Sequence, residues 1–166
     1  MKPREPAPLE DVLAWAESLH AEGRTLVSTN GCFDLFHAGH LQTLYRARSF
    51  GDALVVLVNS DASVRRYKGP ERPFIDEGDR ARLLMALRPV DQVIVFPEDT
   101  PLRMLERLRP HVHVKGGSFD PERIRKEAEC LRAWGGRLEC LELVEGLSST
   151  VLIQKIRGEY PKGDAT

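Results

Sequence analysis

The sequence contains no long hydrophobic run and few cysteines. No apolar stretch approaches the roughly 20 residues of a transmembrane helix, and the first residues, Met1 to Pro6, lack the apolar core of a signal peptide. The three cysteines, Cys32, Cys130 and Cys140, have no disulfide-framework spacing, which is typical of free thiols in a reducing compartment. We therefore expect a cytoplasmic protein without disulfides and without a membrane partner.

The chain also has no large excess of positive or negative charge. The formal net charge is -1, so the overall balance does not indicate nucleic acid or an anionic membrane surface as a partner. A chain of 166 residues suffices for one domain with a substantial core. We predict an N-terminal lead-in and helix over residues 1–23, one domain over 24–158, and a tail over 159–166.

Two common nucleotide-binding motifs are absent. The first predicted turn lacks the Gly-x-Gly-x-x-Gly of nicotinamide-dependent oxidoreductases, and the chain lacks the Gly-x4-Gly-Lys-Ser/Thr of Walker-type ATPases. Both absences disfavour these enzyme classes.

The chain does contain a regular alternation of strand and helix patterns. The apolar run from Asp52 to Asn59 is rich in β-branched residues, which is typical of a strand buried on both faces of a parallel sheet. The patterns predict strands over 25–29, 52–59, 91–96, 112–115 and 138–144, and helices over 9–21, 40–50, from 60, 82–87, 101–108, 121–134 and after 146. This order predicts an α/β fold: a Rossmann-like, doubly wound parallel sheet of about five strands with helices on both faces.

The stretch from Thr29 to His40, TNGCFDLFHAGH, is the centre of the functional prediction. It lies between an apolar strand and an amphipathic helix, so it predicts a strand, a turn and a helix start. His37 and His40 share one face of the first helical turn, beside free backbone N–H groups and the positive end of the helix dipole. Gly39 leaves room for a ligand to approach the backbone. We predict a polyphosphate site in which both imidazoles donate hydrogen bonds to phosphate oxygens.

These residues have other interpretations. A histidine alone is more often a surface residue or a hydrogen-bonded core residue than a catalyst. Cys32 together with His37 and His40 also suggests a metal site, but structural zinc sites normally have four ligands. The other two cysteines lie far along the chain and form no Cys-x-x-Cys pair. We therefore expect no protein metal site, and the conjunction of turn, histidine pair and helix start favours phosphate binding.

The motif His37-Ala38-Gly39-His40, with the preceding Gly31-Cys32-Phe33-Asp34, resembles the signature of the nucleotidyltransferase family of small cytidylyl- and adenylyltransferases. The resemblance runs from about Arg24 to about Arg157 and is strongest to the adenylyltransferase domain of ADP-heptose synthase, an enzyme of lipopolysaccharide precursor synthesis. It implies transfer of AMP from ATP to a phosphorylated acceptor such as heptose 1-phosphate, release of pyrophosphate, and Mg²⁺ held mainly by nucleotide phosphates.

The resemblance also implies roles for individual residues. Lys68, expected in a glycine-proline loop, and Arg80, expected near a helix start, match phosphate-contacting residues of the family, and we expect His37, His40 and Lys68 to be catalytic. Substrate contacts are expected at Asp34, Lys68 and Arg80. Nucleotide contacts are expected at Thr29, Asn30, Gly31, Cys32, Phe33, His37, Gly39, His40, Lys115, Gly116, Gly117, Ser148, Ser149 and Thr150. For Gly116 and Gly117 a simple tight turn is an equal alternative, and the hydroxyls of residues 148–150 are also ordinary helix N-caps.

One departure from the family pattern concerns the base of the nucleotide substrate. Cytidylyltransferases for choline or glycerol phosphate carry an arginine three positions before the glycine of their second signature, where this chain has Leu143 before Gly146. Leucine lacks the charged, forked donors of arginine, which favours ATP, although Leu143 can equally be an ordinary strand residue. A glycerol phosphate cytidylyltransferase, an FMN adenylyltransferase and a nucleotide-sensing domain without chemistry remain alternatives. The resemblance also implies a sugar kinase as a partner, expected as a separate protein, and leaves a homodimer open.

Overall fold

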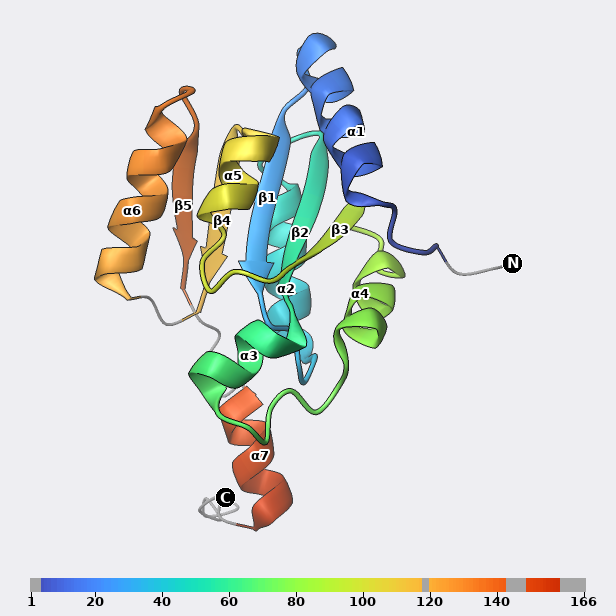
Figure 1. Ribbon diagram of the computed structural model, residues 1–166, viewed down its shortest axis with the longest axis vertical. Helices are drawn as coiled ribbons and strands as arrows, with labels where there is room; N and C mark the ends of the chain where they lie inside the picture. The colour runs from blue at the N-terminus through green and yellow to red at the C-terminus, as the bar shows by residue number, and fades with distance from the viewer. Residues whose placement is uncertain (1–3, 118–119, 143–148, 159–166) are drawn as a thin grey trace, which may run out of the picture.

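The computed structural model describes residues 4–117, 120–142 and 149–158, and its centre is a five-stranded sheet (Figure 1). The strands are β1 (Leu26–Gly31), β2 (Ala53–Asn59), β3 (Gln92–Phe96), β4 (Val112–Gly116) and β5 (Arg137–Leu141). They lie in the order β3-β2-β1-β4-β5, and every neighbouring pair is parallel. The predicted α/β class and parallel sheet are therefore confirmed.

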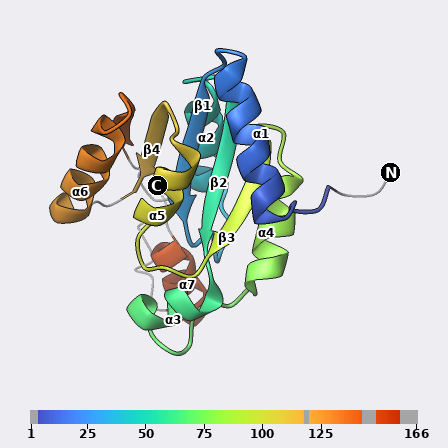
Figure 2. The ribbon, with the colours of Figure 1, turned by 45° about the horizontal axis from the view of Figure 1, so that its top comes forward.

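Helices cover both faces of this sheet. They are α1 (Leu9–Ala21), α2 (Ala38–Arg48), α3 (Asp61–Lys68), α4 (Glu77–Met85), α5 (Leu102–Leu108), α6 (Pro121–Arg132) and α7 (Ser149–Arg157). Figures 1 and 2 show α1, α5 and α6 on one face and α2 and α4 on the other, with α3 and α7 beyond the carboxyl ends of the strands. No helix in the described part of the chain is long and apolar enough to cross a membrane.

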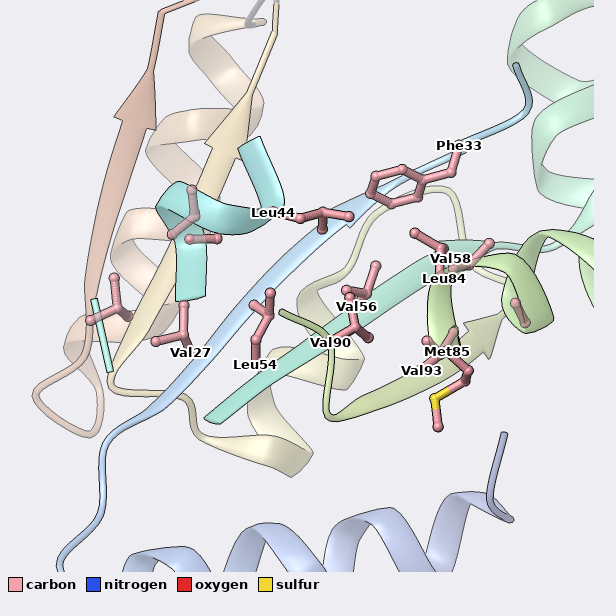
Figure 3. Close-up of a cluster of buried hydrophobic side chains, with 14 of the residues drawn as sticks. Val27, Phe33, Leu44, Leu54, Val56, Val58, Leu84, Met85, Val90 and Val93 are labelled. Atoms are coloured by element: carbon pink, nitrogen blue, oxygen red, sulfur yellow. The ribbon is translucent and has the colours of Figure 1, made fainter. Parts of the chain in front are cut away.

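The core is divided into two hydrophobic clusters by the sheet. All seven residues of β2 are buried, and alternate side chains enter opposite clusters. The cluster under α2 and α4 includes Val27, Leu44, Leu54, Val56 and Leu84 (Figure 3). The cluster under α1 and α5 includes Val12, Leu19, Leu57, Phe96 and Leu105. Each such side chain contributes roughly 1.5–3 kcal/mol when fully buried, so the sheet is a rigid platform for the loops at its carboxyl edge.

Most predicted boundaries differ from the structure by one or two residues, and three differences affect the interpretation. The helix expected over 82–87 spans Glu77–Met85, because the Asp76 carboxylate accepts the backbone N–H of Asp79 over 3.0 Å and caps the helix earlier. Lys68 is the last residue of α3, where a loop was expected. Strand β5 ends at Leu141, so Glu142, predicted as strand, lies outside it, and the last predicted residues, 143–144, lie outside the described residues.

The direction of chain progression reverses between β1 and β4. Strands β1, β2 and β3 are added in one direction, and the chain then returns to place β4 on the other side of β1. In open α/β sheets ligands bind outside the carboxyl ends of the strands at such a switch point. The fold therefore presents the turn after β1, the predicted polyphosphate site, at this position.

Candidate active site

The turn after β1 is built from Gly31 and Phe33. Phe33 has φ of 51°, a left-handed conformation that is uncommon for a residue with a side chain. A Cβ at Gly31 would lie only 3.1 Å from the Phe33 ring, so glycine leaves space for this ring to fold back into the core. The turn thereby directs the following residues toward the start of α2.

His37 and His40 cap the first turn of α2 reciprocally. His37 is the N-cap residue, and its Nδ1 accepts the backbone N–H of His40 over 3.4 Å. The Nδ1 of His40 in turn accepts the backbone N–H of His37, also over 3.4 Å. A neutral imidazole that accepts at Nδ1 carries its proton at Nε2. Both rings are therefore set in the tautomer whose Nε2–H remains available to a ligand.

The surroundings of the two rings keep them uncharged. The rings stack with centroids 3.8 Å apart, and the His40 ring also lies against Phe33 and Phe36. Burial, then the neighbouring His37, then the Lys68 charge lower the pKa of His40 to about 4, and burial lowers the pKa of His37. At neutral pH the helix start therefore presents two neutral N–H donors, which suits the oxygens of a phosphate chain.

Lys68 supplies a positive charge near the histidine pair. It is exposed at the end of α3, and its charge acts on His40. Its ammonium lies 5.9 Å from the centroid of the Tyr67 ring, and no described carboxylate forms an ion pair with it. The charge of Lys68 is thus available for an anionic ligand.

Tyr67 joins α3 to the turn after β1 and was not singled out from the sequence. Its hydroxyl forms a hydrogen bond with the thiol of Cys32, and burial beside that thiol raises the pKa of the phenol. The guanidinium of Arg123 on α6 lies 6.0 Å from the Tyr67 ring. Tyr67 therefore connects three elements around the site, and the Cys32 side chain is engaged in this contact.

Asp34 and Arg80 occupy positions that differ from the substrate-contacting roles expected for them. The Asp34 carboxylate, 1% exposed, accepts from Arg72 over 2.5 Å and from the backbone N–H groups of Phe74 and Ile75. The Arg80 side chain is fully buried. Its guanidinium donates to the Asp61 carboxylate over 2.7 Å and to the carbonyls of Cys32, Asn59 and Ile75.

Both side chains therefore hold the loop between α3 and α4 against the signature turn. Their donors and acceptors are directed at protein groups, so this geometry supports positioning and not contact with a phosphate. A sequence pattern cannot distinguish these roles, because an arginine at a helix start suits a phosphate and a set of carbonyls equally well.

The paired ends of β1 and β4 carry a polar cluster. Thr29 is buried and donates its hydroxyl to the Val114 carbonyl over 2.8 Å. The Lys115 ammonium donates to Asn30 Oδ1 over 2.7 Å and to Glu127 Oε1 over 2.9 Å. Glu127 was missed in the sequence. The available signal was its place four residues before the buried Leu131, on the inner face of α6.

Gly116, Gly117 and Ser149, also predicted as nucleotide contacts, lie around the same edge. A Cβ at Gly116 would come within 2.5 Å of Thr43, so glycine allows β4 to pack against α2, and Gly117 has φ of 119°. The Ser149 hydroxyl donates to the Leu35 carbonyl over 3.4 Å, which brings the start of α7 to the signature turn. Ser148 and the side chain of Thr150 lie outside the described residues.

Comparison with known proteins identifies the family of the chain. Residues 28–155 match the cytidylyltransferase-like family. The chain belongs to this family. It is therefore a nucleotidyltransferase, as the histidine motif indicated.

Similar proteins include two named "Bifunctional protein HldE". The one from Geotalea uraniireducens is 52% identical over 149 residues, 90% of this chain and 30% of that protein. The one from Syntrophotalea carbinolica is 48% identical over 155 residues, 93% of this chain and 31% of that protein. The chain thus spans about a third of the length of these relatives.

A solved structure has the same fold. The crystal structure of the lipopolysaccharide core biosynthesis protein from Thermoplasma volcanium matches with a TM-score of 0.60 and 27% identity, over 74% of this chain and 98% of that one.

Proposed function

We propose that this chain transfers AMP from ATP to the phosphate of a sugar 1-phosphate, with heptose 1-phosphate as the acceptor. The observation that carries the proposal is the reciprocal capping of His37 and His40, which leaves two neutral N–H donors at a helix start beside the sheet's switch point. The resemblance to the adenylyltransferase domain of ADP-heptose synthase and the similarity to the HldE proteins support this acceptor.

In this reaction an acceptor phosphate oxygen attacks the α-phosphorus of ATP. A new P–O bond forms, the bond to the bridging oxygen of the β-phosphate breaks, and pyrophosphate leaves with the electron pair. The reaction requires no protein nucleophile, because positioning and charge stabilisation can supply most of the catalysis. The Nε2–H groups of His37 and His40 would donate to phosphate oxygens, and the ammonium of Lys68 would offset charge that moves toward the leaving group.

We propose that Mg²⁺ accompanies the nucleotide and is held mainly by its phosphates. The described residues contain no group of three His, Cys, Asp or Glu side chains that could hold a metal ion. The carboxylate of the signature turn, Asp34, is occupied by Arg72 and two backbone N–H groups. The side chains at the site are mainly hydrogen-bond donors, which fits phosphate oxygens, and bound Mg²⁺ would neutralise phosphate charge there.

The choice of ATP rests on Leu143, which replaces the arginine of the cytidylyl pattern and lies outside the described residues. The acceptor must already carry its phosphate, so we also propose that a sugar kinase supplies it.

The test is a matrix of ATP and CTP against heptose 1-phosphate, glycerol 3-phosphate and FMN, with release of pyrophosphate measured for each pair. We expect the highest kcat/KM for ATP with heptose 1-phosphate. An efficiency with CTP equal to or above that with ATP would reject the adenylyl assignment, and a higher efficiency with either other acceptor would reject the sugar phosphate. Nucleotide binding without turnover on any acceptor would indicate a sensing domain.

A further inference from the structure

The orientation of the Asn30 side-chain amide is determined by its neighbours. Lys115 donates to the Oδ1 atom over 2.7 Å, and the Nε2 of His113 lies 3.2 Å from the same atom. An ammonium group can only donate, so the atom that it approaches must be the amide oxygen. The amide nitrogen, Nδ2, is therefore the other terminal atom of the Asn30 side chain, pointing away from Lys115. No described residue accepts a hydrogen bond from it.

The tautomer of His113 is consistent with this orientation. His113 is fully buried between β1 and α6, and its Nδ1 lies 2.7 Å from the hydroxyl oxygen of Ser28. Because Nε2 faces the Asn30 oxygen, Nε2 carries the proton and Nδ1 accepts from the hydroxyl. Burial, together with the Lys115 charge, lowers the pKa of His113 well below its ordinary value and keeps the ring neutral.

Glu127, on α6, contacts both Lys115 and His113. Its side chain is 2% exposed, and its Oε1 accepts from Lys115 over 2.9 Å. Its Oε2 lies 3.7 Å from the Nε2 of His113 and has no hydrogen-bond partner among the described residues. The Lys115 side chain is 17% exposed, and a largely buried ammonium without a counter-charge is unfavourable. Loss of Glu127 would therefore release Lys115 from the Asn30 oxygen toward solvent.

We infer that Glu127 is a positioning residue: through Lys115 it holds the Asn30 amide so that its two Nδ2–H donors face the nucleotide. This inference rests on the proposed function and adds to it a specific donor and the residue that orients it.

The position of Asn30 supports a ligand contact. Asn30 is the residue before the last of β1, at the switch point with β4, and it is only half-buried. Its side chain lies on the same face of the sheet as Ser28, two residues earlier, which is the face covered by α5 and α6. The histidine pair belongs to α2 on the other face. A nucleotide in the crevice would therefore meet Asn30 on one side and the histidine donors on the other.

The first experiment uses N30D, which has nearly the same shape as the wild type. One Asp oxygen can still accept from Lys115 and His113, while the other replaces the outward NH2 donor with a negative acceptor. We expect the KM for ATP, and the Kd of a non-hydrolysable ATP analogue, to rise more than about tenfold, roughly the effect of losing one hydrogen bond. The melting temperature should not fall. Unchanged ATP binding in N30D would overturn the inference.

The second experiment tests whether Glu127 acts through Asn30. E127A should raise the KM for ATP by up to about tenfold with a smaller effect on kcat. The matched control is E129A, which removes an exposed glutamate of the same helix and should leave KM unchanged. In an N30A background, E127A should have no further effect on KM, because the amide that it orients is gone.

An equal effect of E127A in both backgrounds would overturn the positioning role, and so would a lower melting temperature with no change in KM. N30D decides the donor role of Asn30 even where E127A fails to fold. If the wild-type chain binds no nucleoside triphosphate, the proposed function fails and this inference fails with it. If the wild-type chain binds the nucleoside triphosphate and N30D and E127A bind it equally well, only this inference fails.

Discussion

His37 and His40 accept each other's backbone N–H at Nδ1, over 3.4 Å in each direction. These two hydrogen bonds therefore cap the helix and select the tautomer of both rings. The same two side chains complete the backbone hydrogen bonding of α2 and leave their Nε2–H groups for a ligand, so structure and proposed catalysis use different nitrogen atoms of each ring.

This separation allows the two roles to be tested independently. In H37N and H40N, the asparagine oxygen can replace Nδ1 as the capping acceptor, but the Nε2–H donor is lost. We expect each variant to lose on the order of 10²-fold or more in kcat, the typical effect of removing one donor to transition-state charge, with an unchanged melting temperature. The matched control is H111N, because His111 also accepts a backbone N–H at Nδ1, from Leu26, but at the opposite edge of the sheet. Wild-type rates in H37N and H40N would contradict the catalytic role.

Stability should fall in acid because of His40. Its pKa is about 4 in the folded protein, against an ordinary value of 6.5. Between these values the unfolded chain binds the proton and the folded protein does not, so the free energy of unfolding decreases as pH drops from 6.5 toward 4. The contribution is at most about 3 kcal/mol. Urea denaturation of wild type and H40N across this range measures it. We expect a shallower pH dependence in H40N, and identical curves would show that His40 is not held neutral by the fold.

Arg80 should contribute to stability through its buried contacts. Replacement by methionine leaves the Asp61 carboxylate without its buried partner and removes donors from three carbonyls, which should lower the free energy of unfolding by about 3 kcal/mol. The control is R82M, two residues further along α4, where the guanidinium is exposed. We expect R82M to melt like wild type. An R80M protein of wild-type stability that has lost only its affinity for substrate would restore the phosphate-contacting role expected from the sequence.

Lys68 should affect turnover and not folding. K68M removes an exposed charge without an ion-pair partner among the described residues, so the melting temperature should stay constant while kcat falls on the order of 10²-fold. R65M, one turn earlier on α3, removes another exposed charge and should retain wild-type kcat. Steady-state kinetics at saturating ATP compare the two variants, and equal rates in K68M and wild type would exclude Lys68 from the reaction.

The sequence alone determined the fold class and indicated where the candidate site lies. The unbroken apolar run of β2 requires burial on both faces, and its alternation with helical patterns leaves a parallel sheet as the solution. The pairing of His37 with His40 was also local, since residues three apart in a helical turn must be neighbours. These inferences depend on interactions between residues close in sequence, and a local sequence pattern is sufficient to predict such interactions.

The tertiary structure alone decided which polar side chains face the protein and which face the site. Arg80 and Asp34 bind groups from distant segments, and the Glu127–Lys115–Asn30 contacts join α6, β4 and β1. A polar side chain bonds to whichever partners surround it, and those partners come from segments up to about half the chain away. Because partners this distant meet only once the sheet order is set, the residue type could suggest a donor or an acceptor but not its target.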